Sequence, residues 1–161
     1  MIVSLVALSS LAIAQLAATG TPAPALDIRP YESSAECGAS EMQIEVVVNG
    51  VTPVGILTVE LYTPSKRHFL KKESRLHRIR VPAENGPQTV CFDIPEAGSY
   101  AIAAYHDLDA DRDLDQKWNR MPAEPFALSS GKKLKFGFPR FEDSAFSVDS
   151  HGTRIVLDLR E

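Results

Sequence analysis

The amino-acid sequence predicts an all-β domain, an antiparallel β-sandwich of about seven strands of the immunoglobulin-like or prealbumin-like kind. Three observations support this class. Apolar residues recur at every second position in several short segments, glycine, proline and asparagine interrupt the chain between them, and no segment sustains a helical period. With 161 residues, 44% of them hydrophobic, the chain is long enough to bury one core.

The first four expected strands lie between residues 42 and 94, in MQIEVVVN, in GILTVELY, around Ile79 and Val81, and in TVCFDI. Side chains alternate between the two faces of a strand, so every second residue should share a face. The residues expected to share a face within their strands are Met42, Ile44, Val46 and Val48; Leu57, Val59 and Leu61; and Val90, Phe92 and Ile94. Thr58, Glu60 and Cys91 should point to the opposite faces.

The expected strands continue in the second half of the chain. SYAIAAYH follows a Pro-Glu-Ala-Gly turn, while Pro122 and Pro125 should keep the next region irregular. KLKFGF and AFSV are short candidates. TRIVLDL should close the domain with Ile155, Leu157 and Leu159 facing inward.

The N-terminal region divides into two parts by composition. Residues 1–18 are apolar and small and contain Ala-Ile-Ala, which predicts a signal peptide, although an uncleaved anchor or a buried strand would also fit. Residues 19–36 carry three prolines and many small residues, which predicts a flexible spacer before a domain spanning residues 37–161. The protein is therefore expected to be periplasmic or secreted, with no stable membrane span once the signal is removed.

The chain contains two cysteines, Cys37 and Cys91, which fit an exported protein with one disulfide. Closing a loop of about 55 residues would stabilise the fold by roughly 4 kcal/mol in the chain-entropy treatment. The alternative is two independent thiols, one of them buried in a strand.

Charge limits the classes of partner. The formal charge of −4 argues against a general nucleic-acid binder, because such proteins need a basic surface to neutralise phosphates. One segment, residues 66–80, is nevertheless basic, with seven Lys or Arg residues and one Glu. It is either a surface for anionic partners such as envelope polyanions or a solvated loop anchored by Phe69 and Leu70.

An acidic segment, HDLDADRDLDQKW at residues 106–118, carries an aspartate at every second position. These residues are Asp107, Asp109, Asp111, Asp113 and Asp115. Alternate carboxylates on a tight loop can supply several of the roughly six to eight oxygens that calcium prefers. The aspartates are therefore candidate calcium ligands, and the alternative is a solvated acidic turn, in which aspartate is common.

Two positions depart from the twelve-residue calcium loop of EF-hand proteins. Arg112 stands where glycine permits the sharp turn, and a left-handed backbone there would cost roughly 1–2 kcal/mol. Trp118 stands where a bidentate carboxylate is needed, and Glu124 is expected to substitute for it if the chain folds back after Pro122. The predicted site is of the weak extracellular class, with a dissociation constant of about 0.1–1 mM.

Catalysis has little support in the sequence. No G-x-S-x-G, H-E-x-x-H or phosphate-binding glycine loop is present, so no residue is assigned as catalytic. His106 adjoins the acidic segment, and with nearby carboxylates it could act as a base in a cell-envelope hydrolase. The alternative is a hydrogen-bonded strand terminus.

Three motifs in the last third of the chain carry a family resemblance: GSYAIAAYHDLDADRDLD, MPAEPFALS and FPRFEDSAFSV. In their order and spacing they resemble a bacterial family catalogued as domain of unknown function 2141. The resemblance implies a small exported β-sandwich protein, and it implies no activity. The sequence as a whole thus predicts an exported, non-enzymatic module with a weak calcium site, with the hydrolase and a surface interaction protein acting through residues 66–80 as alternatives.

Overall fold

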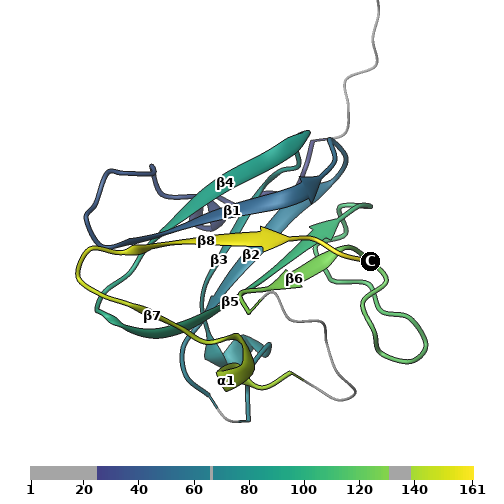
Figure 1. Cartoon of the computed structure of the whole chain (residues 1–161). Coiled ribbons are helices and arrows are strands. Elements are labelled where there is room, and N and C mark those ends of the chain that lie inside the picture. Colours follow the sequence, from purple (N-terminus) through teal and green to yellow (C-terminus); the bar gives the residue numbers. More distant parts are fainter. Residues whose placement is uncertain (1–24, 66, 131–138) are drawn as a thin grey trace, which may run out of the picture.

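The structure of the protein is a computed structural model that describes residues 25–65, 67–130 and 139–161. As predicted, nearly all of its regular structure is β (Figure 1). The strands are β1 (Gln43–Val51), β2 (Ile56–Tyr62), β3 (Arg75–Pro82), β4 (Gly86–Asp93), β5 (Gly98–Asp107), β6 (Phe126–Leu128), β7 (Phe146–Val148) and β8 (Thr153–Asp158). They are accompanied by the short helices η1 (Pro30–Glu32), η2 (Lys72–Ser74) and α1 (Phe141–Ser144). The predicted signal peptide and the expected strand KLKFGF lie outside the described residues.

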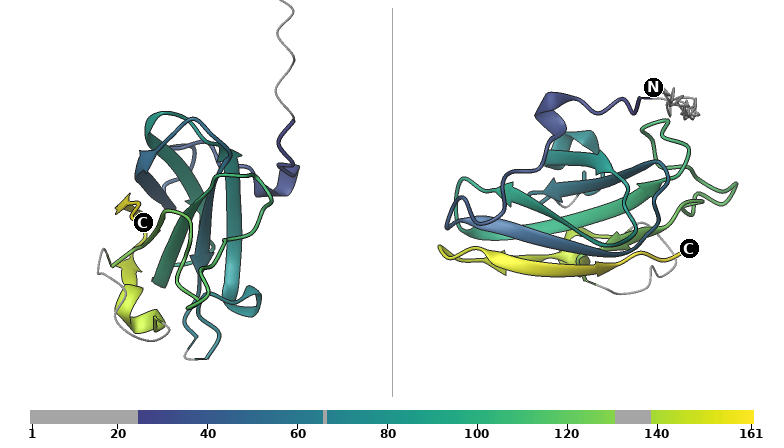
Figure 2. Two further views of the ribbon diagram at one scale, coloured as in Figure 1. Left: turned by 90° about the vertical axis from the view of Figure 1, so that its right-hand side faces the viewer. Right: turned by 90° about the horizontal axis from the view of Figure 1, so that it is seen from above.

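The strands form two packed sheets, which confirms the predicted sandwich (Figure 2). One sheet has the order β4-β1-β8, and the other has the order β3-β2-β5-β6 with β7 also paired to β5. Within the described part of the chain, the paired strands run antiparallel except β1 and β8, which are parallel from Ile44↔Thr153 to Asn49↔Asp158. The period-two pattern could not reveal that exception, because it is the same for parallel and antiparallel strands facing one core.

The core lies between the two sheets and follows the predicted alternation. Ile44, Val46 and Val48 of β1 and Leu57, Val59 and Leu61 of β2 are fully buried in one cluster. Phe92 and Leu157 join this cluster, while Val156, between the inward positions of β8, is 55% exposed. The spacing of apolar residues therefore predicted the inner face correctly.

The outer face of the second sheet is also covered, which the alternation did not predict. Tyr62, Phe69, Ala101, Leu128 and Phe141 form a second buried cluster there, and the predicted anchors Phe69 and Leu70 both pack in it. Phe69 comes from the loop before β3 and Phe141 from α1, so these two segments cover this face. Consequently all seven residues of β2 are buried, including its polar ones.

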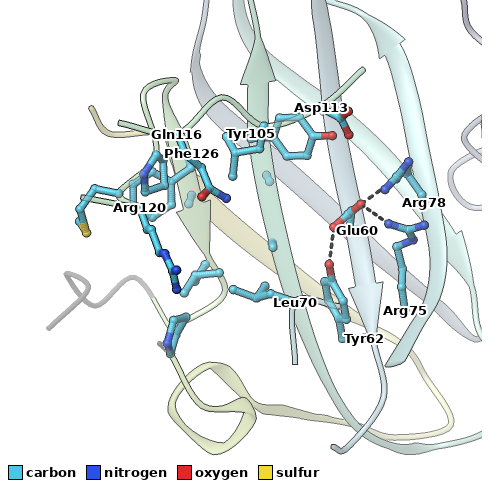
Figure 3. A pocket seen from close by; sticks show the side chains of 18 of the residues that line it. Glu60, Tyr62, Leu70, Arg75, Arg78, Tyr105, Asp113, Gln116, Arg120 and Phe126 are labelled. Carbon is cyan, nitrogen blue, oxygen red and sulfur yellow. Dashed lines mark hydrogen bonds and ion pairs between the residues drawn. The ribbon is translucent and has the colours of Figure 1, made fainter. Parts of the chain in front are cut away.

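Glu60 is a buried carboxylate residue on this outer face (Figure 3). Its Oε1 lies 2.8 Å from Nη1 of Arg75 and 2.6 Å from Nε of Arg78, and Tyr62 donates its hydroxyl to Oε2. Arg80, two residues further along β3, is only 1% exposed. Three of the cations of the basic segment are thus bound within the fold, so the β3 part of that segment is not a free basic surface.

β6 is an element that the sequence analysis missed. Its three residues pair with β5 from Ala103↔Leu128 to Tyr105↔Phe126, directly after Pro125. The prolines before it correctly predicted an irregular approach, but a strand of three residues is too short to show a period.

The segment before Cys37, predicted to be a flexible spacer, makes specific contacts where it is described. Glu32 of η1 is 3% exposed beside β3, and the Ala35 N–H donates to the Cys91 carbonyl over 3.0 Å. The Cys37–Cys91 disulfide, which the sequence predicted, joins this segment to β4, with the two Cα atoms 5.3 Å apart. The ordered contacts of the domain therefore begin before Cys37.

None of the helices in the described ranges is long and apolar enough to cross a bilayer.

Removing the disulfide should lower the free energy of unfolding by about 4 kcal/mol, because the bond closes a loop with a sequence separation of 54 residues. The measurement is urea unfolding of the oxidised protein and of the double variant Cys37→Ala/Cys91→Ala. Reduced wild-type protein serves as the second comparison and should match the variant. Equal midpoints for oxidised and reduced protein would contradict the prediction.

Candidate metal centre

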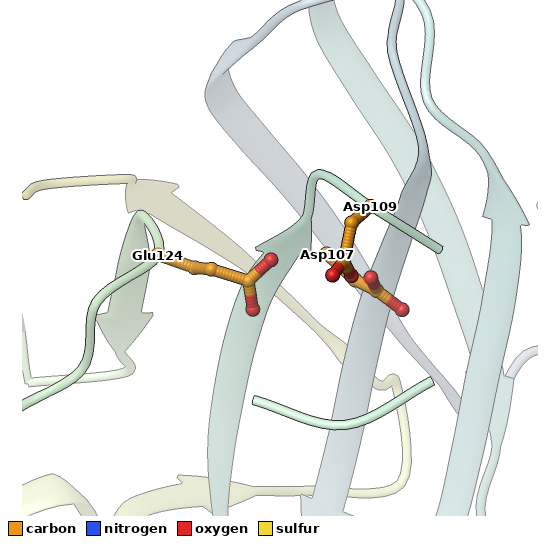
Figure 4. Close-up of side chains that lie close together, drawn as sticks. All are labelled: Asp107, Asp109 and Glu124. Carbon is orange, nitrogen blue, oxygen red and sulfur yellow. The ribbon is translucent and has the colours of Figure 1, made fainter. Parts of the chain in front are cut away.

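Three carboxylates meet where β5 ends and the chain leaves the sheet. Asp107 is the last residue of β5, Asp109 follows in the loop, and Glu124 comes just before β6 on the returning chain (Figure 4). One carboxylate oxygen from each lies within 4.8 Å of the other two. The fold-back after Pro122 that the sequence analysis required for Glu124 is therefore present.

Asp107 is the most constrained of the three. Its side chain is fully buried, and its Oδ2 accepts the backbone N–H of Arg112 over 2.8 Å. Its Oδ1 is buried without a hydrogen-bond partner in the described part of the chain. Burial raises the pKa of Asp107, the amides of Arg112 and Ala110 only partly offset this, and the charges of Asp111 and Asp109 raise it further. A buried carboxylate oxygen with an open coordination position is costly unless a proton or a cation occupies it.

Glu124 closes the loop at its base. It is 6% exposed, and its two oxygens accept the backbone N–H groups of Leu108 (2.7 Å) and Asp115 (3.1 Å). Burial raises its pKa, the two amides counteract this, and the charges of Asp107 and Asp115 add to the rise. Glu124 thus ties the start and the middle of the acidic segment to the strand that follows it.

Asp109 and Asp111 also stabilise the turns of the segment. Asp109 Oδ1 accepts the N–H of Asp111 (3.2 Å), and Asp111 Oδ1 accepts the N–H of Asp113 (2.8 Å), so consecutive side chains hydrogen-bond the backbone two residues on. Asp111, Asp113 and Asp115 lie outside the group of three among the described residues. The structure therefore brings together three of the six candidate ligands, at the two ends of the loop.

Arg112 adopts the left-handed backbone that the sequence analysis considered, with φ of 79°. Its side chain lies 3.1 Å from both carboxylate oxygens of Glu32, and its carbonyl accepts hydrogen bonds from Arg80 and Tyr105. These contacts hold a conformation that otherwise costs roughly 1–2 kcal/mol. The position that departs from the calcium-loop pattern is therefore stabilised by a residue 80 positions away in the sequence.

Glu32 and Arg80 complete this network, and the sequence analysis missed both. Arg80 Nη1 lies 2.5 Å from Glu32 Oε1, with the two side chains 1% and 4% exposed. Burial raises the pKa of Glu32, but Arg80, the Arg29 amide and Arg112 outweigh it, so the pKa lies below the ordinary value. No local signal marks the pair, since a Glu in a proline-rich segment and an Arg in a basic strand are ordinary surface residues.

His106 faces away from the carboxylates. It shares the inner face of β5 with Tyr100, Ile102 and Ala104, whereas Asp107 is on the outer face. Its Nε2 lies 2.7 Å from the Val54 carbonyl, which can only accept, so this nitrogen carries the proton. The geometry is that of a hydrogen-bonded strand terminus.

Gly55 is a positioning residue that the sequence analysis did not single out. Its φ is 73°, and a Cβ there would clash with the carbonyl oxygen of Asp107 and lie 2.9 Å from that of Leu108. The turn before β2 therefore packs directly against the backbone of Asp107 and Leu108. Only glycine fits this approach.

The fold and the site define a two-sheet β-sandwich with a partly buried acidic centre at the end of strand β5. The chain belongs to the bacterial family described as "Uncharacterized protein conserved in bacteria (DUF2141)", which matches residues 46–156. This match confirms the resemblance and contains all three carboxylates of the centre. No curated protein and no solved structure matches the chain.

Gly55→Ala should destabilise the protein by about 2–4 kcal/mol, since it combines a left-handed backbone with a clash against the Asp107 carbonyl. Gly86→Ala is the matched control, with φ of 96° and no atom within 4 Å of the added Cβ. It should cost only the backbone term of roughly 1–2 kcal/mol. The measurement is thermal or urea unfolding, and equal losses in the two variants would contradict the close approach.

Glu32→Gln should lower the free energy of unfolding at pH 7 by about 3 kcal/mol, because it leaves the Arg80 guanidinium buried without its counter-ion. The exposed Glu84→Gln is the control and should be close to neutral. The folded-state pKa of Glu32 is depressed, so its contribution is present above the ordinary value of 4.5 and is lost as the pH falls through the folded value. Urea unfolding at several pH values should therefore show the difference between wild type and variant shrinking in acid, and a constant difference would count against this assignment.

Proposed function

We propose that this protein is an exported, non-enzymatic β-sandwich module whose acidic loop is held by a calcium ion. The observation that carries the proposal is Asp107 Oδ1, a buried carboxylate oxygen without a hydrogen-bond partner in the described chain, within reach of Asp109 and Glu124. A cation between the three carboxylates would supply the missing partner and would offset their mutual repulsion.

The ligand set favours a hard divalent cation. All three groups are carboxylates, which suit calcium, magnesium and manganese rather than zinc or copper. Asp107 and Glu124 are buried and held by backbone amides, whereas Asp109 is exposed, so water has access to the remaining coordination positions. Calcium accepts such irregular, partly hydrated geometry more readily than magnesium, and the affinity belongs to the weak extracellular class of about 0.1–1 mM.

Export and the absence of catalysis are parts of the same proposal. The Cys37–Cys91 disulfide supports an oxidising compartment, periplasmic or extracellular, in agreement with a signal peptide at residues 1–18. The ring of His106 is engaged by the Val54 carbonyl on the opposite face of β5 from the carboxylates, which supports a structural part for it. The bound ion then serves to hold the loop between β5 and β6 in one conformation.

Calcium titration should give a saturable binding heat with a dissociation constant of about 0.1–1 mM and a rise in melting temperature. Asp109→Asn removes a ligand from an exposed position and should abolish both responses. The control is Asp143→Asn, an exposed carboxylate of α1 that pairs with Arg140, and it should leave both unchanged.

Two further variants separate the ligands. Asp107→Asn should also abolish the calcium response while making the calcium-free protein more stable, because it removes a buried charge but keeps an acceptor for the Arg112 amide. Asp111→Asn should leave calcium affinity within about twofold if only the group of three binds the ion. No heat and no thermal shift at several millimolar calcium would refute the proposed site, and an equal response to magnesium would refute its assignment to calcium.

A further inference from the structure

A second feature is a pocket of about 760 Å³ on the outer face of the β3-β2-β5-β6 sheet (Figure 3). The sheet forms its floor, and residues of the loop between β5 and β6, including Gln116 and Met121, form one wall. Leu70, from the loop between β2 and β3, lies on another side. The volume lies in the range of pockets that hold drug-sized molecules, roughly 300–1,000 Å³.

The hollow follows from small residues on the central strand. In one row across the sheet, Arg78, Glu60, Ala103 and Leu128 are neighbours on β3, β2, β5 and β6. The methyl group of Ala103 leaves depth between the larger side chains on either side of it. Phe126 on β6 and Leu70 add apolar walls, so the body of a ligand would lie against hydrocarbon and an aromatic ring.

The charged groups of the lining are unevenly compensated. They are three arginines, Arg75, Arg78 and Arg120, and two carboxylates, Glu60 and Asp113. Glu60 forms ion pairs with both Arg75 and Arg78, so these three side chains together carry an excess positive charge. Asp113 is exposed at the rim beside Tyr105.

Arg120 stands on the side of the pocket opposite Arg75 and Arg78 (Figure 3). Its side chain makes no hydrogen bond or ion pair with any other residue that the structure describes. Its backbone is left-handed, with φ of 64°, and is held by a hydrogen bond from its own N–H to the Lys117 carbonyl over 2.8 Å. A cation without a counter-ion at the edge of an apolar pocket provides a place for one anionic group.

We propose that this pocket binds a small amphipathic carboxylate, with its hydrocarbon or aromatic body over Ala103 and Phe126 and its carboxylate on Arg120. Planar guanidinium groups bind carboxylates through two parallel hydrogen bonds, which fixes the orientation of such a ligand. The inference goes beyond the cation site and does not rest on it, because none of the three carboxylates of that site lines the pocket.

Isothermal titration calorimetry with octanoate tests the proposal, with 1-octanol as the neutral probe of the same chain length. Octanoate should bind saturably and at least threefold more tightly than 1-octanol. Arg120→Gln should weaken octanoate binding about fivefold and leave 1-octanol unchanged, since it removes only the charge. Arg154→Gln, an exposed arginine of the other sheet, is the matched control and should have no effect.

Ala103→Leu fills the floor of the pocket and should weaken both probes by at least tenfold, with retention of the melting transition as proof of folding. Because Arg120 is exposed, its variant keeps the test decisive even if Ala103→Leu fails to fold. Absence of octanoate binding, equal affinities for the two probes, or equal effects of the Arg120 and Arg154 substitutions would each overturn the proposal. The titrations are run both with calcium and with a chelator. Octanoate binding in the chelator would support the pocket even if the protein binds no calcium.

Discussion

The buried contact of Glu32 with Arg80 and Arg112 is the interaction on which the geometry of the acidic loop depends. It joins three parts of the chain that are distant in sequence: the segment before Cys37, strand β3 and the acidic loop after β5. Because Arg80 is nearly inaccessible to water, it requires a partner, and Glu32 meets that requirement. The same carboxylate holds Arg112 in the left-handed conformation that directs its N–H at Asp107. The acidic centre is therefore positioned partly by an N-terminal segment whose composition suggests only a spacer.

The sequence predicted what local patterns can encode. Alternation assigned the inward residues of β1, β2 and β8, and the cysteine count predicted the disulfide. The acidic segment directed attention to Asp107 and Asp109, and the ligand missing at its end directed attention to Glu124. It did not reveal long-range partners such as Glu32 with Arg80, because their side chains are ordinary for exposed positions until the fold brings them together. The parallel pairing of β1 with β8 and the close approach of Gly55 to Asp107 likewise depend on tertiary geometry.

The loop between β5 and β6 contributes to both proposed sites, the cation site and the outer pocket. Its base carries the three carboxylates, and its distal residues, including Arg120 and Met121, form a wall of the outer pocket. Glu124 hydrogen-bonds two amides of this loop, so the position of the wall is linked mechanically to the position of the acidic centre. An ion at the base would restrict the loop, and a more restricted wall loses less conformational entropy when a ligand binds.

The parallel pairing of β1 with β8 has a consequence for the order in which the molecule can assemble. Asn49 and Asp158, partners in this pair, are separated by 109 positions, and β1 is the middle strand of its sheet. Until the last strand arrives, one edge of β1 has unpaired backbone groups, which is a template for association with other chains. Such distant pairing is slow to form. The pairing of β8 with β1 is therefore expected to complete this sheet late in folding.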